Sequence, residues 1–213
     1  MSALIVELDP LFLGGFALPA EVLSQRLEKY GIADADPYRF VRYAYGHTMA
    51  DALKTLLPRN IDPLHVERRL AASYAAQLQL NAQQAQPALK SFFKPLAKLG
   101  IQIAVITRLR PSVIAELFEG IAPETIAVFD PAPLAVGIGL ETFQAAVVAL
   151  GTPVRHCTAL LACGASVRSA VRVGLRAVAV PDPMVAFENC AGAALVADAC
   201  DKKLLTKLKE KLA

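Results

Sequence analysis

Five short apolar runs of β type recur along the chain, and segments with helical spacing separate them. The runs lie at residues 4–8, 101–106, 125–129, 158–162 and 176–180. The helical segments, bounded mostly by proline or glycine, lie at residues 87–100, 111–120, 141–151 and 165–174. Nearly continuous apolar strands that alternate with helices are typical of a parallel sheet with both faces covered. We therefore predict an α/β fold built on a Rossmann-like, doubly wound parallel sheet.

The interval between the first two runs is helical in pattern throughout. The steps Asp36-Pro37 and Asp62-Pro63 each have the form of a helix N-cap followed by proline at the first helical position. An insert after the first strand would fold over the carboxyl ends of the strands, where ligands bind in open α/β sheets. We therefore predict a core domain made of residues 1–14 and 86–213, and an inserted α-helical cap domain made of residues 15–85.

Composition limits the class of protein. The chain has 213 residues and is 55% apolar, which is enough apolar material for a full core and argues against disorder. Prolines and arginines interrupt every apolar run well short of the roughly 18 residues of a membrane span, so we expect none. The amino terminus lacks the basic residues and cleavage site of a secretion signal, so we expect a cytoplasmic protein. The four cysteines lack metal-site spacing and are expected to be buried free thiols.

The formal net charge of +3 is carried by the end of the chain. Residues 201–213 hold five lysines against Asp201 and Glu210, so the rest of the chain is close to neutral. A nucleic-acid partner needs basic groups clustered over a face of the whole domain, so we exclude one. The leucines at 204, 205, 208 and 212 share one face of a predicted terminal helix. Docking of this helix on the core is the favoured interpretation, with a membrane-surface or partner-binding helix as the alternatives.

Four segments of this layout resemble the haloacid-dehalogenase superfamily. The segments are LIVELDPL at 4–11, where the family has a strand ending in D-x-D-G-T, YGHTMADAL at 45–53, IQIAVIT at 101–107 and VGLRAVAVP at 173–181. The second resembles the substrate-facing loop of the cap, the third a strand ending in Thr or Ser, and the last the passage after the fourth motif. The branch of the family that it resembles has a helical cap after the first strand, as in phosphoglycolate phosphatases and β-phosphoglucomutases.

The resemblance implies roles for five residues. Glu7 takes the position of the aspartate that attacks phosphorus, and Asp9 takes that of the acid and base. Thr107 takes the position of the hydroxyl that contacts phosphate, and Arg108 beside it could supply positive charge in place of the family's lysine. His47 would face a ligand from the cap. Since side chains two residues apart in a strand share a side, we expect Glu7 and Asp9 to lie on the same side of the strand end.

The other charged groups of the family's site are missing. The family's lysine falls on Gly137, and its late pair of acids, which helps to hold magnesium, falls on Leu161 and Ala162. Residues 142–181 contain no Asp, Glu or Lys at all. Phosphoryl transfer needs cations that offset the repulsion between an anionic nucleophile and an anionic phosphoryl group. A lysine and an acid that are lost together leave the local charge balance tolerable, which is the pattern expected of a site that has lost its reaction.

Other interpretations of these residues remain open. Glu7 and Asp9 could be catalytic remnants, a cation site or acids that cap nearby helices. Thr107 could be a structural hydroxyl, and His47 a packed or solvated side chain.

We therefore predict a hydrolase-fold protein of the haloacid-dehalogenase type that is catalytically impaired. It would bind a small anionic ligand or a protein partner in the cleft between core and cap, without a cofactor. The first alternative is an atypical phosphohydrolase that acts on a small phosphorylated metabolite, and only this alternative would involve Mg²⁺. The second is a structural or assembly protein that uses the cap face or the tail helix.

Overall fold

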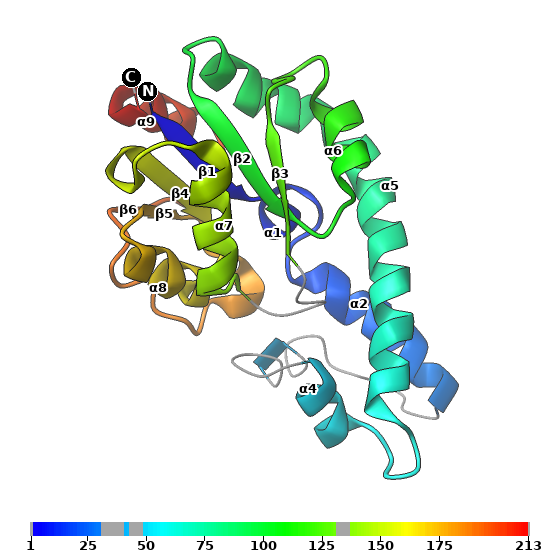
Figure 1. Ribbon diagram of the computed structural model, residues 1–213. Helices are drawn as coiled ribbons and strands as arrows, with labels where there is room; N and C mark the ends of the chain where they lie inside the picture. The colour runs from blue at the N-terminus through cyan, green and yellow to red at the C-terminus, as the bar shows by residue number, and fades with distance from the viewer. Residues whose placement is uncertain (1, 31–40, 43–48, 131–136, 213) are drawn as a thin grey trace.

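A six-stranded parallel sheet runs through the computed structural model, which describes residues 2–30, 41–42, 49–130 and 137–212 (Figure 1). The strands are β1 (Ala3–Glu7), β2 (Gln102–Thr107), β3 (Ile126–Phe129), β4 (Cys157–Leu161), β5 (Arg176–Ala179) and β6 (Leu195–Val196). Their order is β3-β2-β1-β4-β5-β6, and each neighbouring pair is parallel. This order confirms the predicted Rossmann-like sheet. The sequence pattern missed β6, which is only two residues long.

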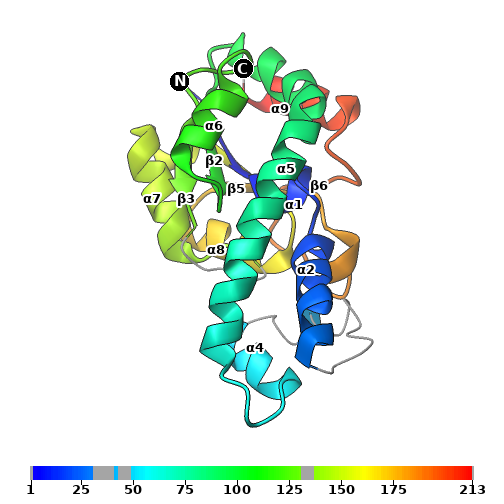
Figure 2. The same cartoon turned by 90° about the vertical axis from the view of Figure 1, so that its right-hand side faces the viewer.

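Helices cover the sheet and extend beyond one end of it (Figures 1 and 2). They are α1 (Leu8–Phe12), α2 (Ala17–Leu27), α4 (Met49–Leu56), α5 (Pro63–Ala97), α6 (Pro111–Phe118), α7 (Leu140–Leu150), α8 (Gly164–Val173) and α9 (Lys202–Leu212). Helices α2, α4 and the first part of α5 form the group that projects beyond the carboxyl ends of the strands. This group corresponds to the predicted cap.

Burial on both faces explains why β1 is apolar throughout. Leu4 and Val6 lie in the core cluster that includes residues of α5, α6 and α9, whereas Ala3 and Ile5 lie in the cluster that includes residues of α7 and α8. Alternate side chains of a strand point to opposite faces, so a central strand with helices on both sides must be apolar at every position. A charged residue at the end of such a strand is therefore already inside the molecule.

Helix α5 spans 35 residues and continues from the cap into the core. Its amino terminus is capped as expected, because the Asp62 side chain accepts a hydrogen bond from Leu64 N at 3.0 Å. The predicted helix start at Pro87 is wrong, since Pro87 lies inside α5. The division between a core and a cap at residues 85 and 86 stays a prediction, and this boundary falls within the continuous helix (Figure 2).

Four phenylalanines hold α1 against α5 and α6. Phe12 of α1 lies 5.4 Å from Phe92 and 5.3 Å from Phe93, ring centre to ring centre, and Phe93 lies 5.3 Å from Phe118 of α6. Edge-on and tilted ring contacts of this kind add to the stabilisation that comes from burial. The short helix that follows β1 is thereby fixed in orientation.

The terminal helix α9 docks on the core as predicted. The side chains of Leu204, Leu205, Leu208 and Leu212 are all buried. The apolar face of this helix is therefore not available to a membrane or a partner. No helix within the described ranges is long and apolar enough to cross a membrane.

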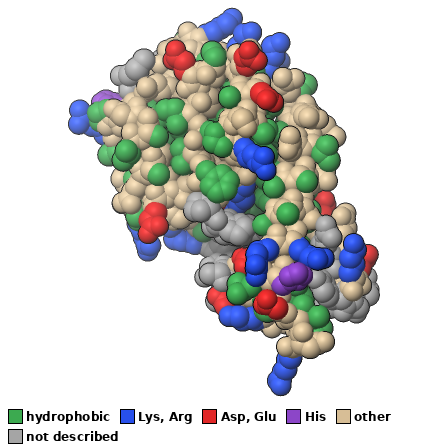
Figure 3. Space-filling model, turned by 45° about the vertical axis from the view of Figure 1, so that its right-hand side comes forward, with side chains coloured by type: hydrophobic (Ala, Val, Ile, Leu, Met, Phe, Trp, Pro, Cys, Tyr) green, Lys and Arg blue, Asp and Glu red, His purple; other side chains and the backbone are tan. Residues whose placement is uncertain are grey.

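The cysteines follow the sequence expectation in part. All four cysteines are free thiols, but only Cys157 and Cys163 are fully buried, whereas Cys190 and Cys200 are partly exposed. On the face shown in Figure 3, Lys and Arg side chains are dispersed among acidic, hydrophobic and other side chains over both core and cap.

Polar and ring contacts between described residues tie the cap to the core. They include Phe16 N to Asp182 Oδ2 at 3.0 Å, Asn81 Nδ2 to Leu13 O at 2.8 Å, and the Arg42 guanidinium 5.6 Å from the ring centre of Phe187. These contacts come from segments far apart in the sequence. The orientation of the cap is therefore fixed at several points besides α5.

Candidate functional site

Polar side chains gather at the point where successive strands stop adding to one side of β1 and begin to add to its other side. The first three strands build one half of the sheet, and β4 then starts the other half beside β1. Ligands in open α/β sheets bind at such a switch point, outside the carboxyl ends of the strands. Glu7 and Thr107 end β1 and β2, and Asp130 follows β3, with its N–H bonded to Thr107 O at 3.0 Å. These strand ends define the candidate site.

Asp9 is held by the end of β2. Thr107 Oγ1 donates to Asp9 Oδ1 at 2.5 Å, and Arg108 N donates to Asp9 Oδ2 at 2.9 Å. The Thr107 hydroxyl also accepts from Leu109 N at 3.0 Å. Burial raises the pKa of the Asp9 carboxyl, against the opposing effects of Arg108 and Thr107. The hydroxyl that was expected to contact phosphate is thus bonded to Asp9 and to the backbone.

Glu7 turns toward the other half of the sheet. Its Oε2 accepts from Ala162 N at 2.9 Å, and the Ser166 hydroxyl is a second hydrogen-bond partner. The strand alternation expected to place Glu7 and Asp9 on one side does not extend to Asp9, because β1 ends at Glu7 and α1 begins at the next residue. Burial raises the pKa of the Glu7 carboxyl from 4.5 to about 7, although Ala162, Ser166 and Arg108 each oppose the change.

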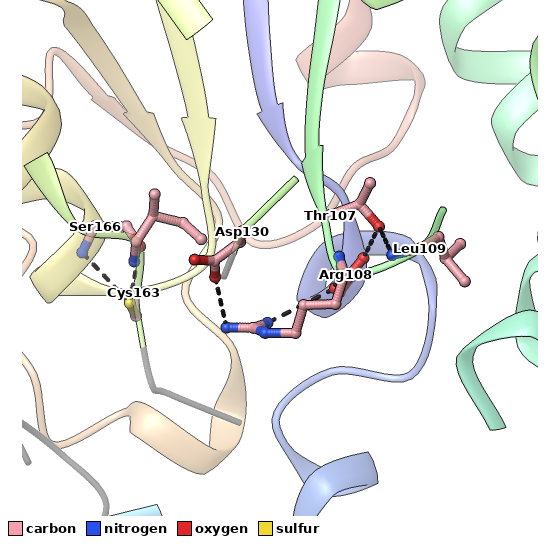
Figure 4. A network of polar contacts seen from close by, with 8 residues as sticks. Thr107, Arg108, Leu109, Asp130, Cys163 and Ser166 are labelled. Carbon is pink, nitrogen blue, oxygen red and sulfur yellow. Dashed lines mark hydrogen bonds and ion pairs between the residues drawn. The ribbon is translucent and has the colours of Figure 1, made fainter. Parts of the chain in front are cut away.

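Arg108 bridges two carboxylates with its guanidinium (Figure 4). Its Nη2 lies 2.8 Å from Asp130 Oδ2, and its Nη1 lies 3.6 Å from Asp9 Oδ2. The Arg108 side chain is only 10% exposed, and the two carboxylates are almost fully buried. Buried ion pairs of this kind depend on one another, because a buried charge without its partner is strongly destabilising.

Tyr74 of α5 brings the cap helix into the same cluster. Its side chain is 5% exposed and makes a hydrogen bond with Arg108. Burial raises the pKa of the Tyr74 hydroxyl, which therefore stays neutral. Through Arg108, a residue of α5 is connected to the ends of β1, β2 and β3.

Solved structures share this arrangement of sheet and helices over nearly the whole chain, although no protein-family model and no curated protein matches the sequence. CbbY from Rhodobacter sphaeroides, solved with xylulose-(1,5)-bisphosphate, matches with a TM-score of 0.70 and 15% identity, covering 95% of this chain and 96% of that chain. β-Phosphoglucomutase from Clostridium difficile matches with a TM-score of 0.70 and 16% identity, covering 100% and 97%. A hydrolase from Pseudomonas syringae matches with a TM-score of 0.68 and 19% identity, covering 99% of each chain.

The chain has the haloacid-dehalogenase fold. At these identities the likeness establishes the fold alone, and the chemistry of the site must be judged from its own residues.

The end of β4 carries no carboxylate at residues 161 and 162, where the resemblance places a pair of acids. Ala162 presents its N–H to Glu7, and Cys163 is the N-cap of α8, with its thiol accepting from Ser166 N at 3.5 Å. The Ser166 hydroxyl accepts from Ile138 N at 2.9 Å. Burial and the nearby Glu7 hold the pKa of the Cys163 thiol well above its ordinary value, so it is a neutral thiol.

The position of the family's lysine is closed by packing. Gly137 has a φ of +90°, and a Cβ built on it would lie 2.7 Å from Ala165 Cβ and 3.2 Å from Cys163 Sγ. Side chains other than that of glycine are strained at this φ. A lysine at residue 137, where the resemblance places one, would not fit without movement of α8.

The described residues at the strand ends do not fit a divalent metal ion. Across the described parts of the chain, no three His, Cys, Asp or Glu side chains are grouped so as to hold one. The guanidinium of Arg108 lies on Asp9 and Asp130, and the donor nearest Glu7 at β4 is a backbone N–H. Magnesium needs several oxygen ligands in near-octahedral geometry, which this set does not offer.

Four of the five predicted site residues lie together at the strand ends, and His47 lies outside the described residues. The sequence reasoning missed Asp130, Tyr74 and Ser166. Asp130 carried a usable signal, because it follows an apolar strand directly, as Thr107 ends one, but the proline after it favoured a turn. Tyr74 and Ser166 lie within helices and carry no local signal of their position.

Proposed function

We propose that this protein is a haloacid-dehalogenase-fold protein without efficient phosphoryl-transfer activity, and that its cleft serves binding. The observation that carries the proposal is the pairing of the Arg108 guanidinium with Asp9 and Asp130. Phosphoryl transfer requires cations aimed at the phosphoryl oxygens and an ionised nucleophile in line with phosphorus. Among the described residues, the cation at these strand ends is already paired with two carboxylates of the same chain.

The state of Glu7 supports the same proposal. Its carboxyl is bonded to Ala162 N and Ser166, and with a pKa of about 7 it is largely protonated under mildly acidic conditions. A carboxyl in this state is a poor nucleophile. The extra methylene of glutamate relative to aspartate also displaces the carboxylate by about 1 Å, which costs on the order of 10² in rate where geometry is tight.

The ligand of the cleft would be a small anion or a protein partner. Within the part of the chain that the structure describes, Arg108 faces both Asp9 and Asp130, and Glu7 adds further negative charge when it is ionised. Excess negative charge repels a free anion at short range. An anionic ligand would therefore have to replace Asp9 or Asp130 as the ion-pair partner of Arg108. A protein partner could instead bind the outer surface of core and cap and leave these ion pairs intact.

A panel of phosphorylated metabolites, assayed with and without Mg²⁺, tests the proposal. We expect phosphate release by the wild-type protein to be no faster than that by Glu7→Gln, which keeps the size of the side chain and its acceptor oxygen. The same panel is screened for ligands that raise the melting temperature. Turnover that depends on Mg²⁺ and disappears in Glu7→Gln would contradict the proposal.

An atypical phosphohydrolase is the second candidate function. It is favoured by the fold shared with β-phosphoglucomutase and CbbY, and by a Glu7 carboxyl that is half ionised at neutral pH. In this case Glu7 would act as nucleophile or water-orienting base, Asp9 as acid, and Arg108 as the phosphate contact. A phosphoryl adduct on Glu7 found by mass spectrometry, or its trapping with beryllium fluoride, would support this candidate over the first.

A further inference from the structure

The surroundings of Arg108 suit a planar guanidinium better than a spherical ion. Two of its nitrogens face carboxylates from different segments, Asp9 of α1 and Asp130 after β3, and Tyr74 approaches from α5. A guanidinium presents several N–H groups in a fixed plane, so it can address three acceptors in three directions. A lysine ammonium could not hold all three from the same backbone position with comparable geometry.

We propose, on the basis of the proposed function above, that the Arg108 guanidinium is a built-in cation that takes the place of a divalent metal in this fold. The pocket formed by Asp9, Asp130 and Tyr74 is thereby a guanidinium site. It holds the strand ends and the cap helix together without any exchangeable ion.

Because Asp9 and Asp130 are buried, they need a cation such as the Arg108 guanidinium beside them. The Asp9 side chain is 1% exposed and that of Asp130 is 3% exposed, and both form ion pairs with Arg108. Carboxylates in such surroundings need a cation or must take up protons. Because the cation is covalently attached, its local concentration does not depend on the metal content of the solution.

The donor groups around the pocket also select against a metal. Thr107 Oγ1 and Arg108 N donate hydrogen bonds to both oxygens of Asp9, and Ala162 N donates to Glu7. These donors occupy lone pairs that a metal would need, and they remain in place when the Arg108 side chain is removed. The emptied pocket should therefore still prefer a guanidinium over Mg²⁺.

Chemical rescue of Arg108→Ala tests this proposal. Alanine keeps the Cβ and the backbone N–H to Asp9, and the missing part of the side chain corresponds to ethylguanidinium. We expect Arg108→Ala to melt on the order of 5–10 °C below the wild type, because two buried carboxylates lose their partner. Millimolar ethylguanidinium should restore a large part of this loss, whereas equal concentrations of ethylammonium or Mg²⁺ should not.

Matched controls separate a site from a general salt effect. Arg110→Ala removes an exposed arginine two residues away, and its melting temperature should not respond to ethylguanidinium. The wild-type melting temperature should be the same in Mg²⁺ and in a chelator. If Arg108→Ala folds only in the presence of ethylguanidinium, this dependence is itself the rescue. Arg108→Lys provides a second variant, expected to melt below the wild type although its charge is kept.

The proposal is overturned if Mg²⁺ stabilises the wild type or restores Arg108→Ala better than ethylguanidinium does. It is equally overturned if Arg108→Lys is as stable as the wild type, or if no guanidinium compound restores Arg108→Ala. None of these results measures turnover. Phosphatase activity in the metabolite panel would contradict the proposed function and leave the melting data standing, so the two failures are distinguishable.

Discussion

At the scale of single residues, the site is governed by competition between burial and hydrogen bonding. The Glu7 carboxyl is 1% exposed, and burial outweighs the bonds from Ala162 and Ser166 in setting its pKa. Thr107, by contrast, uses its hydroxyl to hold Asp9 and Leu109 N. Each of these side chains already has a hydrogen-bond partner within the protein. We therefore assign the cluster to binding and stability rather than to catalysis.

Glu7 should make the stability of the protein depend on pH. Its pKa is about 7 in the folded state and about 4.5 in the unfolded chain. Between these values the folded state keeps a proton that the unfolded chain releases, so the free energy of unfolding falls as pH rises from 4.5 to 7. The loss should be on the order of 3 kcal/mol. Urea unfolding at a series of pH values measures it.

Glu7→Gln provides the control for this pH dependence, because an amide cannot ionise. Its free energy of unfolding should lack the Glu7 contribution to the slope between pH 4.5 and 7. A variant with the same slope as the wild type would show that another group, such as Asp9, causes the dependence.

Gly137→Ala should destabilise the protein by roughly 2 kcal/mol or more. The positive φ disfavours any L side chain, and the new Cβ would collide with Ala165 Cβ and crowd Cys163 Sγ. Gly139→Ala is the matched control, because a Cβ there meets no atom within 4 Å and the φ of −71° is ordinary. Urea midpoints compare the two variants. Equal losses of stability in the two variants would mean that packing at residue 137 does not cause the destabilisation of Gly137→Ala.

At the scale of elements, α5 is the least expected feature, because proline inside a helix removes a backbone donor and crowds the preceding turn. Pro87→Ala should therefore stabilise the protein by about 1–3 kcal/mol, reduced by the greater freedom that alanine gives the unfolded chain. Pro63→Ala is the control, since proline is well tolerated at the first position of a helix. Thermal unfolding measures both. A destabilised Pro87→Ala would show that a bend at this proline serves the packing.

The strands and most helices could be predicted because their signals are local. An apolar run that ends at glycine or proline specifies an element wherever it lies, as Gly151 shows by closing α7 with a φ of +61°. The continuity of α5 could not be predicted in this way. Pro87 carries a start signal, and only packing of Leu89, Phe92 and Phe93 against the sheet and α1 keeps the helix unbroken.

The candidate site could be predicted only in part, for a related reason. Glu7, Asp9 and Thr107 stand next to strand ends, and parallel strands bring their carboxyl ends to one edge. The pairing of Arg108 with Asp130 depends on the order of β2 and β3 in the sheet, and its bond to Tyr74 depends on the path of α5. Contacts set by tertiary arrangement leave no pattern in a single sequence.

At the scale of the whole molecule, core and cap should unfold together. Helix α5 belongs to both, and the Arg108 bond to Tyr74 and the Phe16 bond to Asp182 join them at separate points. We expect one thermal transition, with calorimetric and van't Hoff enthalpies in agreement. Hydrogen exchange should show equal protection of α5 on either side of residue 85. Two transitions, or early exchange confined to residues 63–85, would contradict this expectation.

The central position of β1 has a consequence for biosynthesis. Strand β1 leaves the ribosome before both of its partners, since it pairs with β2, about a hundred residues later in the chain, and with β4, later still. Both hydrogen-bonding edges of this very apolar segment therefore lack their partner strands while the cap helices are being synthesised. Pairings of such long sequence separation slow folding and expose nascent chains to aggregation. The newborn protein should accordingly depend on chaperones until its second half has been translated.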